Sequence, residues 1–197
     1  LRKQGITIGE GRTIYETTHP PLGKWWMSLG IRVFGMTPFG WRCVCALFGI
    51  LMVPVSYAFM RKISRSTWIA SFAALLIVFD FMHFTLSRIG TIDVIVGFFI
   101  LLTFYLMYLV LDDLKMGCSW KTVCLMILNG MAAGAAMASK WTGVYACAGI
   151  AVLFFTFLFQ EYGTAAARTR KGMSGQAAIS YLAGLSVICI AAYILIP

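Results

Sequence analysis

Charged residues and histidines stand at the ends of apolar runs in this sequence, where their chemistry suits an anionic ligand. The residues of this kind are His19, Lys24, Arg42, Asp80, His83, Arg88, Asp93 and Lys140. Arg offers a forked pair of N–H donors to phosphate oxygens, and Lys offers a compact point charge. A lipid-linked phosphosugar would present its phosphate at the depth of the membrane headgroups. The residue types therefore favour a site for such a phosphate.

Each of these residues also has a purely structural interpretation. Arg42 follows Trp41 at the start of an apolar run, where its guanidinium could reach the headgroups without any ligand. Arg88 and Asp93 are five residues apart and could pair with each other to fix a turn. Lys140 could be an interfacial anchor. Both interpretations stay open for each of these residues.

A transfer reaction at such a site would need a carboxylate to take a proton from the acceptor hydroxyl. Asp93 is the best acidic candidate, although it could instead orient Arg88. Asp112, Asp113 and Glu161 fall at the other side of the predicted membrane, where we expect solvated loops. They are therefore not candidates for the site.

The elements that must position these residues are membrane helices. The chain has 60% hydrophobic and 12% charged residues and a mean hydropathy of +0.86, whereas a soluble domain carries about 25% charge. The net charge of +9 does not indicate nucleic-acid binding, because the basic residues are spread between apolar runs. The six cysteines lack the spacing of a zinc site or a disulfide framework.

Hydrophobic runs predict an all-α, polytopic transmembrane bundle of about six spans. The predicted spans are 39–60, 67–80, 91–111, 122–139, 142–159 and 176–196. The second is short and could extend through Phe84, and a turn is expected over 81–88. Paired prolines and two tryptophans predict a loop leading into an interfacial helix over 22–34. The domains expected are thus a first loop with this helix, 1–38, and a helical membrane domain, 39–197. Gly130, Gly134 and Ala138 share a helix face, which predicts a close approach of a neighbouring helix.

Basic loops predict the orientation of the spans. After the first, third and fifth spans come Arg61, Lys62, Arg65, Lys115, Lys121, Arg168, Arg170 and Lys171. The positive-inside rule places these loops in the cytoplasm and the candidate site outside, although the segment before residue 39 is also basic. We expect a multi-pass cell-membrane protein whose active face is extracytoplasmic.

Four motifs resemble those of the protein O-mannosyltransferase family in its bacterial form. They are His19-Pro20-Pro21-Leu22-Gly23-Lys24, Phe39-Gly40-Trp41-Arg42, Ser87-Arg88-Ile89-Gly90-Thr91-Ile92-Asp93 and Ser139-Lys140-Trp141-Thr142-Gly143. They occur in the family's order and cover most of the chain. The resemblance implies a C-type membrane glycosyltransferase that moves mannose from a polyprenyl-phosphate carrier to Ser or Thr hydroxyls of secreted or membrane proteins.

The resemblance also implies roles for individual residues. Arg42, Arg88 and Lys140 would hold the carrier phosphate, while His19, Pro20, Pro21 and Lys24 would belong to the outer loop near the donor. Neither a metal nor another cofactor is expected, because polyprenyl-phosphate mannose is a substrate. The family includes dimers, which leaves self-association open.

The chain departs from the family at its beginning. The family's catalytic Asp-Glu pair lies upstream of the His-Pro-Pro motif, and neither Glu10 nor Glu16 belongs to such a doublet. We therefore expect an internal fragment that is inactive alone. Two alternatives remain: a related transferase that places a lipid-linked sugar such as aminoarabinose on a lipid, and a transporter or flippase without covalent chemistry. The latter would need paired broken helices and an internal repeat.

Overall fold

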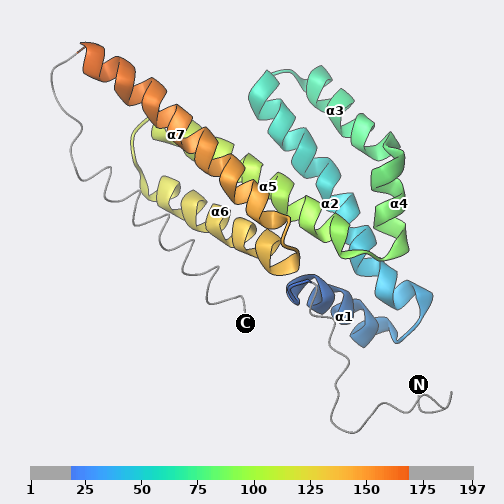
Figure 1. Ribbon diagram of the computed structural model, residues 1–197. Helices are drawn as coiled ribbons and strands as arrows, with labels where there is room; N and C mark the ends of the chain where they lie inside the picture. Colours follow the sequence, from blue (N-terminus) through green and yellow to red (C-terminus); the bar gives the residue numbers. More distant parts are fainter. Residues whose placement is uncertain (1–18, 169–197) are drawn as a thin grey trace, which may run out of the picture.

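A computed structural model describes residues 19–168, and this part of the chain forms seven helices joined by short turns (Figure 1). They are α1 Leu22–Phe34, α2 Pro38–Ser64, α3 Thr67–Phe79, α4 Phe81–Ile89, α5 Ile92–Leu114, α6 Trp120–Ser139 and α7 Gly143–Arg168. The prediction of an all-α fold is confirmed. The helix predicted over 22–34 is present with these bounds, while its place at the membrane interface stays a prediction.

Local sequence signals set several helix ends. Thr37 accepts a hydrogen bond from the Gly40 backbone N–H (3.1 Å) and is followed by Pro38, so α2 begins with a side-chain cap and a proline suited to its first turn. At the other end of α2, Arg65 takes the left-handed conformation (φ 55°), and Gly90 does the same between α4 and α5 (φ 73°). Glycine commonly ends helices in this way.

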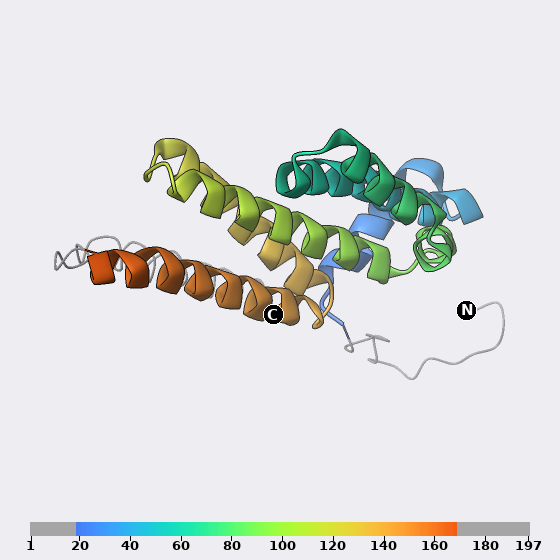
Figure 2. The same ribbon diagram turned by 90° about the horizontal axis from the view of Figure 1, so that it is seen from above.

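Helix α5 is the centre of the described bundle. In Figures 1 and 2 it lies between α2 on one side and the α6–α7 pair on the other, and it contacts all three. Two apolar clusters fill these contacts. The first joins α2 to α5 through Cys45, Phe48, Val94, Ile95 and Phe98, and the second joins α5 to α6 and α7 through Met107, Val110, Ala133, Ile150 and Phe154.

Four of these helices are long and apolar enough to cross a membrane: α2, α5, α6 and α7 as far as Glu161. The bent pair of α3 and α4 makes a fifth if the two helices form one span. The protein is therefore a polytopic helical membrane protein, and five of the six predicted spans have counterparts in the structure. The sixth, 176–196, lies outside the described residues.

The second predicted span differs in detail from the structure. The sequence suggested a span over 67–80 followed by a turn, but residues 81–89 form helix α4, inclined at 54° to α3. The turn prediction was wrong because Asp80 starts a new helix: its carboxylate accepts from the His83 backbone N–H (2.8 Å). Helix α3 contacts only α2 and α4 among the described elements, and Trp68 and Phe79 are 87% and 80% exposed on it, as suits a lipid-facing surface.

Candidate functional site

All four sequence motifs gather at one end of the bundle, which we call the site end. Helices α2 and α5 run in the same direction, since the Cys45 thiol near the start of α2 donates to the Thr91 carbonyl at the start of α5 (3.4 Å), and the Tyr108 hydroxyl near the end of α5 donates to the Lys62 carbonyl (3.4 Å). Helix α6 is antiparallel to α5 (Figure 1). The starts of α2 and α5 therefore share the site end with the end of α6.

An ion pair between Lys140 and Asp93 joins α6 to α5 at the site end. Asp93 lies in the first turn of α5, and Lys140 caps the end of α6, with its backbone N–H bonded to the Ala136 carbonyl (3.1 Å). A carboxylate at a helix start and an ammonium at a helix end are each favoured by the dipole of their own helix. The pair is partly exposed, at 23% for the Lys140 side chain and 40% for Asp93.

The His-Pro-Pro motif packs directly beside this ion pair. Gly23, in the first turn of α1, lies so close to α5 and α6 that a Cβ there would be 3.0 Å from Ile92 and 3.5 Å from Ser139. Pro20 is buried, and His19, Pro21 and Lys24 are half-buried. The Nδ1 atom of His19 is buried and has no hydrogen-bond partner among residues 19–168. The motif thus contributes a buried polar atom that has no partner within the described residues.

The Gly-Trp-Arg motif at the start of α2 packs against the turn between α4 and α5. A Cβ at Gly90 would lie 3.0 Å from the Trp41 ring, and the left-handed backbone there also favours glycine. Arg42 lies over the Trp41 ring (4.8 Å to the centroid) and is exposed. The second and third motifs are therefore in direct contact.

Arg88 is also held against an aromatic ring. Its guanidinium carbon is 4.1 Å from the centroid of Phe84, one turn earlier in α4, and the side chain is exposed. In the described part of the chain, neither Arg42 nor Arg88 forms an ion pair. A guanidinium over a ring keeps its N–H donors available to an anion.

The structure decides one question that the sequence left open. Asp93 pairs with Lys140 and forms no ion pair with Arg88. Arg88 lies in the last turn of α4 before the chain turns at Gly90, whereas Lys140 caps the end of α6, which packs along α5. Asp80 and His83 do not join the pair either, because Asp80 caps α4 and His83 lies beside Gly49 of α2.

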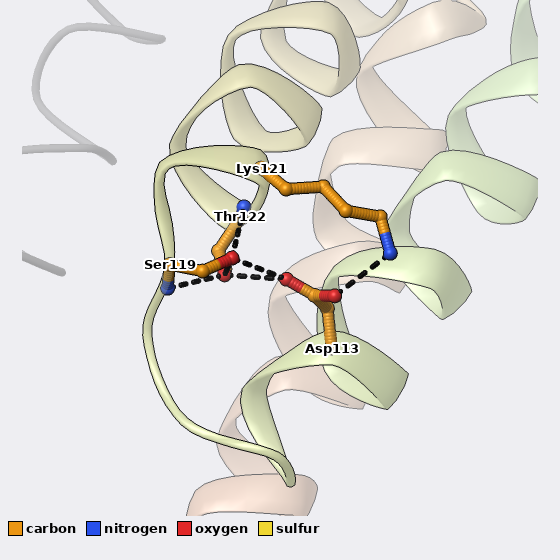
Figure 3. Close-up of polar contacts among 4 residues, drawn as sticks. All are labelled: Asp113, Ser119, Lys121 and Thr122. Atoms are coloured by element: carbon orange, nitrogen blue, oxygen red, sulfur yellow. Dashed lines mark hydrogen bonds and ion pairs between the residues drawn. The ribbon is translucent and has the colours of Figure 1, made fainter.

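The opposite end of the bundle holds a polar cluster that the sequence interpretation did not anticipate (Figure 3). Asp113 was expected in a solvated loop, but it accepts hydrogen bonds from Thr122 (2.6 Å), Lys121 (2.9 Å) and Ser119 (3.1 Å). Ser119 and Thr122 also form a reciprocal capping box at the start of α6. The polar residues three apart before an apolar run were the available signal.

Comparison with known proteins finds relatives in the family that the four motifs resemble. The model of the dolichyl-phosphate-mannose-protein mannosyltransferase family matches residues 17–196. A polyprenol-phosphate-mannose–protein mannosyltransferase of Mycobacterium tuberculosis is 31% identical over 188 residues, which cover 85% of this chain and 34% of the relative. The Corynebacterium glutamicum protein of the same name is 32% identical over 168 residues, covering 74% and 32%.

A vertebrate protein also matches. Protein O-mannosyl-transferase 2 of Danio rerio is 32% identical over 108 residues, which cover 46% of this chain and 14% of that protein. The chain spans about a third of the length of its bacterial relatives. The family match extends over the whole described bundle, including all four motifs at its site end, and so this chain belongs to the dolichyl-phosphate-mannose-protein mannosyltransferase family.

Proposed function

We propose that the protein containing this chain transfers mannose from polyprenyl-phosphate mannose to Ser or Thr hydroxyls of other proteins. The observation that carries this proposal is the meeting of the four motifs at one end of the bundle, around the Lys140–Asp93 pair. The names of the bacterial relatives give the same donor and the same class of acceptor.

In the proposed reaction, the cations stabilise a negative charge that increases as the reaction proceeds. The acceptor oxygen attacks C1 of mannose, the bond from C1 to the phosphate oxygen breaks, and the hydroxyl proton passes to a carboxylate base. The phosphate, singly charged in the donor, leaves as polyprenyl phosphate with additional negative charge. Fixed cations bind that developing charge more strongly than the donor, and so they lower the barrier.

We assign the donor phosphate to Lys140, Arg42 and Arg88. Each lies on a motif at the site end, and their charges come from three helices, α6, α2 and α4. Asp93 is a positioning residue in this proposal, because its ion pair holds the Lys140 ammonium in place. The loop of His19, Pro20 and Pro21 with Lys24 would form the wall beside the donor.

We further propose that the site end faces the extracytoplasmic side, where secreted and membrane proteins are the acceptors. Support comes from the turns at the other end. Arg61 and Lys62 lie in the last turn of α2 and Arg65 in the α2–α3 turn, while Lys115 and Lys121 flank the α5–α6 turn. Basic turns of this kind favour the cytoplasm. A transporter would instead need paired broken helices, and residues 19–168 contain one bent pair, α3 with α4.

The test is transfer of radiolabelled mannose by the full-length protein. Purified protein is mixed with labelled polyprenyl-phosphate mannose and a Ser/Thr-rich acceptor peptide, and a peptide with Ala at those positions serves as the control. Label should enter only the hydroxyl-bearing peptide. Absence of transfer from a demonstrably folded preparation would refute the function, and label entering a lipid acceptor instead would favour the related lipid-modifying transferase.

A further inference from the structure

A cleft at the end of the bundle opposite the site end is lined by cations and tyrosines. It lies between the ends of α2 and α5 and has a volume of about 570 Å³, within the range of sites that bind small molecules. Its lining includes Arg61, Lys62 and Arg65 together with Tyr57, Tyr105 and Tyr108. We call these six residues the basic cleft.

Two of the three tyrosines of the basic cleft, Tyr105 and Tyr108, are held by contacts with α2, while its cations remain available. The ring of Phe59 packs against Tyr105 (5.7 Å between centroids) and Tyr108 (6.0 Å), and the Tyr108 hydroxyl donates to the Lys62 carbonyl. All three cations are exposed, and within residues 19–168 none of them forms an ion pair, although Asp112 also lines the cleft. The cleft therefore offers several cationic N–H donors beside two packed tyrosine rings.

The position of the basic cleft is that of a membrane surface. Arg61 lies 19 residues after Arg42 on the same helix, a rise of about 28 Å in an α-helix. A hydrocarbon core is about 30 Å thick. If the site end lies at one layer of headgroups, the basic cleft lies at the other.

An apolar stripe leads from the membrane interior to the basic cleft. Leu51, Pro54, Ala58 and Arg61 recur at intervals of three and four and so share one face of α2, and Arg65 follows as the residue that caps the end of the helix. Leu51 and Pro54 are exposed, and Ala58 lines the cleft. The face thus changes from apolar to cationic toward the end of the helix, as a phospholipid changes from acyl chain to phosphate. A free phosphate ion would use only the cationic part.

Arg65 adds an observation from the backbone. It ends α2 in the left-handed conformation (φ 55°), where glycine is the usual residue because it has no Cβ. The sequence places a cation there instead, and its side chain lines the basic cleft.

We propose that the basic cleft binds the headgroup phosphate of an anionic phospholipid, in the leaflet opposite the site end. Arg61, Lys62 and Arg65 contact the phosphate oxygens, and the tyrosines face the glycerol region. The lipid would bridge α2 and α5 at an end where Tyr108 already joins them.

The experiment is native mass spectrometry of the full-length protein titrated with phosphatidylglycerol or phosphatidylcholine in detergent, without mannosyl donor. The wild-type protein should bind phosphatidylglycerol more tightly. The Arg61→Gln/Lys62→Gln variant should lose about fivefold in affinity for each cation removed, with binding of phosphatidylcholine unchanged. The matched control, Lys115→Gln/Lys121→Gln, removes two cations from the same end but outside the cleft, and it should retain its affinity within about twofold.

A second variant separates binding from folding. Arg65→Gly removes a cation while providing the residue that the left-handed backbone prefers, so its melting temperature should be maintained while its affinity for phosphatidylglycerol falls. Equal losses in the two double variants, or full affinity in Arg65→Gly, would overturn the proposal. Displacement of the lipid by excess inorganic phosphate would also overturn it and assign the cleft to a free anion. Because no sugar is transferred in this experiment, its failure leaves the proposed function standing.

Discussion

Two Lys–Asp ion pairs join α5 to α6, one at each end of the bundle, and their surroundings differ. At the end away from the site, Asp113 of α5 pairs with Lys121 of α6 (2.9 Å). At the site end, Asp93 of α5 pairs with Lys140, which ends α6. The same two residue types on the same two helices therefore allow a direct comparison.

The carboxylate is the more buried partner in the first pair, and the ammonium in the second. The Asp113 side chain is 15% exposed and that of Lys121 72%, whereas Asp93 is 40% exposed and Lys140 23%. Asp113 accepts two further hydrogen bonds from hydroxyls, while Asp93 accepts only from Lys140 among the side chains of the described region. The first pair stabilises the α5–α6 turn, and the second holds the Lys140 ammonium at the site end.

The largest effect on transfer should follow from removing the Lys140 ammonium at the site end. Lys140→Ala should lower kcat/KM for mannose transfer by about 100-fold, because a fixed positive charge at the leaving phosphate is lost. The measurement is steady-state transfer by the full-length protein in the assay described above. Activity within a factor of two of the wild type, with normal membrane insertion, would remove Lys140 from the donor site.

Asp93→Asn should have the next largest effect, a loss of about tenfold in transfer, because the neutral amide no longer holds the ammonium by charge. A positioning role predicts that Asp93→Glu recovers part of the activity and that both variants raise KM for the donor. If Asp93→Asn abolished transfer with the donor KM unchanged, Asp93 would instead act as the catalytic base.

Asp113→Ala should affect stability rather than transfer. It leaves the hydroxyls of Ser119 and Thr122 without their shared acceptor, so the melting temperature should fall while donor KM stays within about twofold. Asp112→Ala is the matched control, since Asp112 is the exposed neighbour in α5. A loss of transfer in Asp113→Ala without any thermal shift would contradict the assigned role.

The smallest effect is expected from Lys121→Ala. Its ammonium is largely exposed, and exposed ion pairs contribute little because water and salt screen them. Neither mannose transfer nor the melting temperature should change measurably. At high salt concentration, too, the variant and the wild type should have the same melting temperature. A drop as large as that of Asp113→Ala would mean that the ammonium, and not the hydroxyls, fastens the turn.

The sequence predicted the membrane helices and the gathering of the motifs, since both depend on local signals. Apolar runs of sufficient length mark α2, α5, α6 and α7. Each motif stands at a helix end, and the alternation of spans brings such ends to the same side of a bilayer. Counting the membrane crossings between one motif and the next therefore predicts that all four motifs lie on the same side of the bilayer.

Contacts between helices were less accessible from the sequence. Proximity along the chain suggested Arg88 as the partner of Asp93, but packing of α6 on α5 provides Lys140. The small residues around Gly134 suggested a close approach of a neighbouring helix; a Cβ at Gly134 itself would meet nothing within 4 Å, whereas one at Gly143, where α7 begins, would collide with the α6 backbone at Ala136. Rotation of a helix about its axis decides such contacts, and hydropathy alone does not determine it.

The bend between α3 and α4 governs how far the chain travels through the bilayer. With a rise of 1.5 Å per residue, α3 is about 20 Å long and α4 about 14 Å. Inclined at 54°, α4 adds only about 8 Å along the direction of α3 and shifts the chain sideways by about 11 Å. The two helices together span about 28 Å, close to the thickness of the acyl-chain layer. If the two helices form one span, Arg88, in the last turn of α4, lies near phosphate depth and is displaced sideways from the line of α3, beside α2 and α5, which α4 contacts.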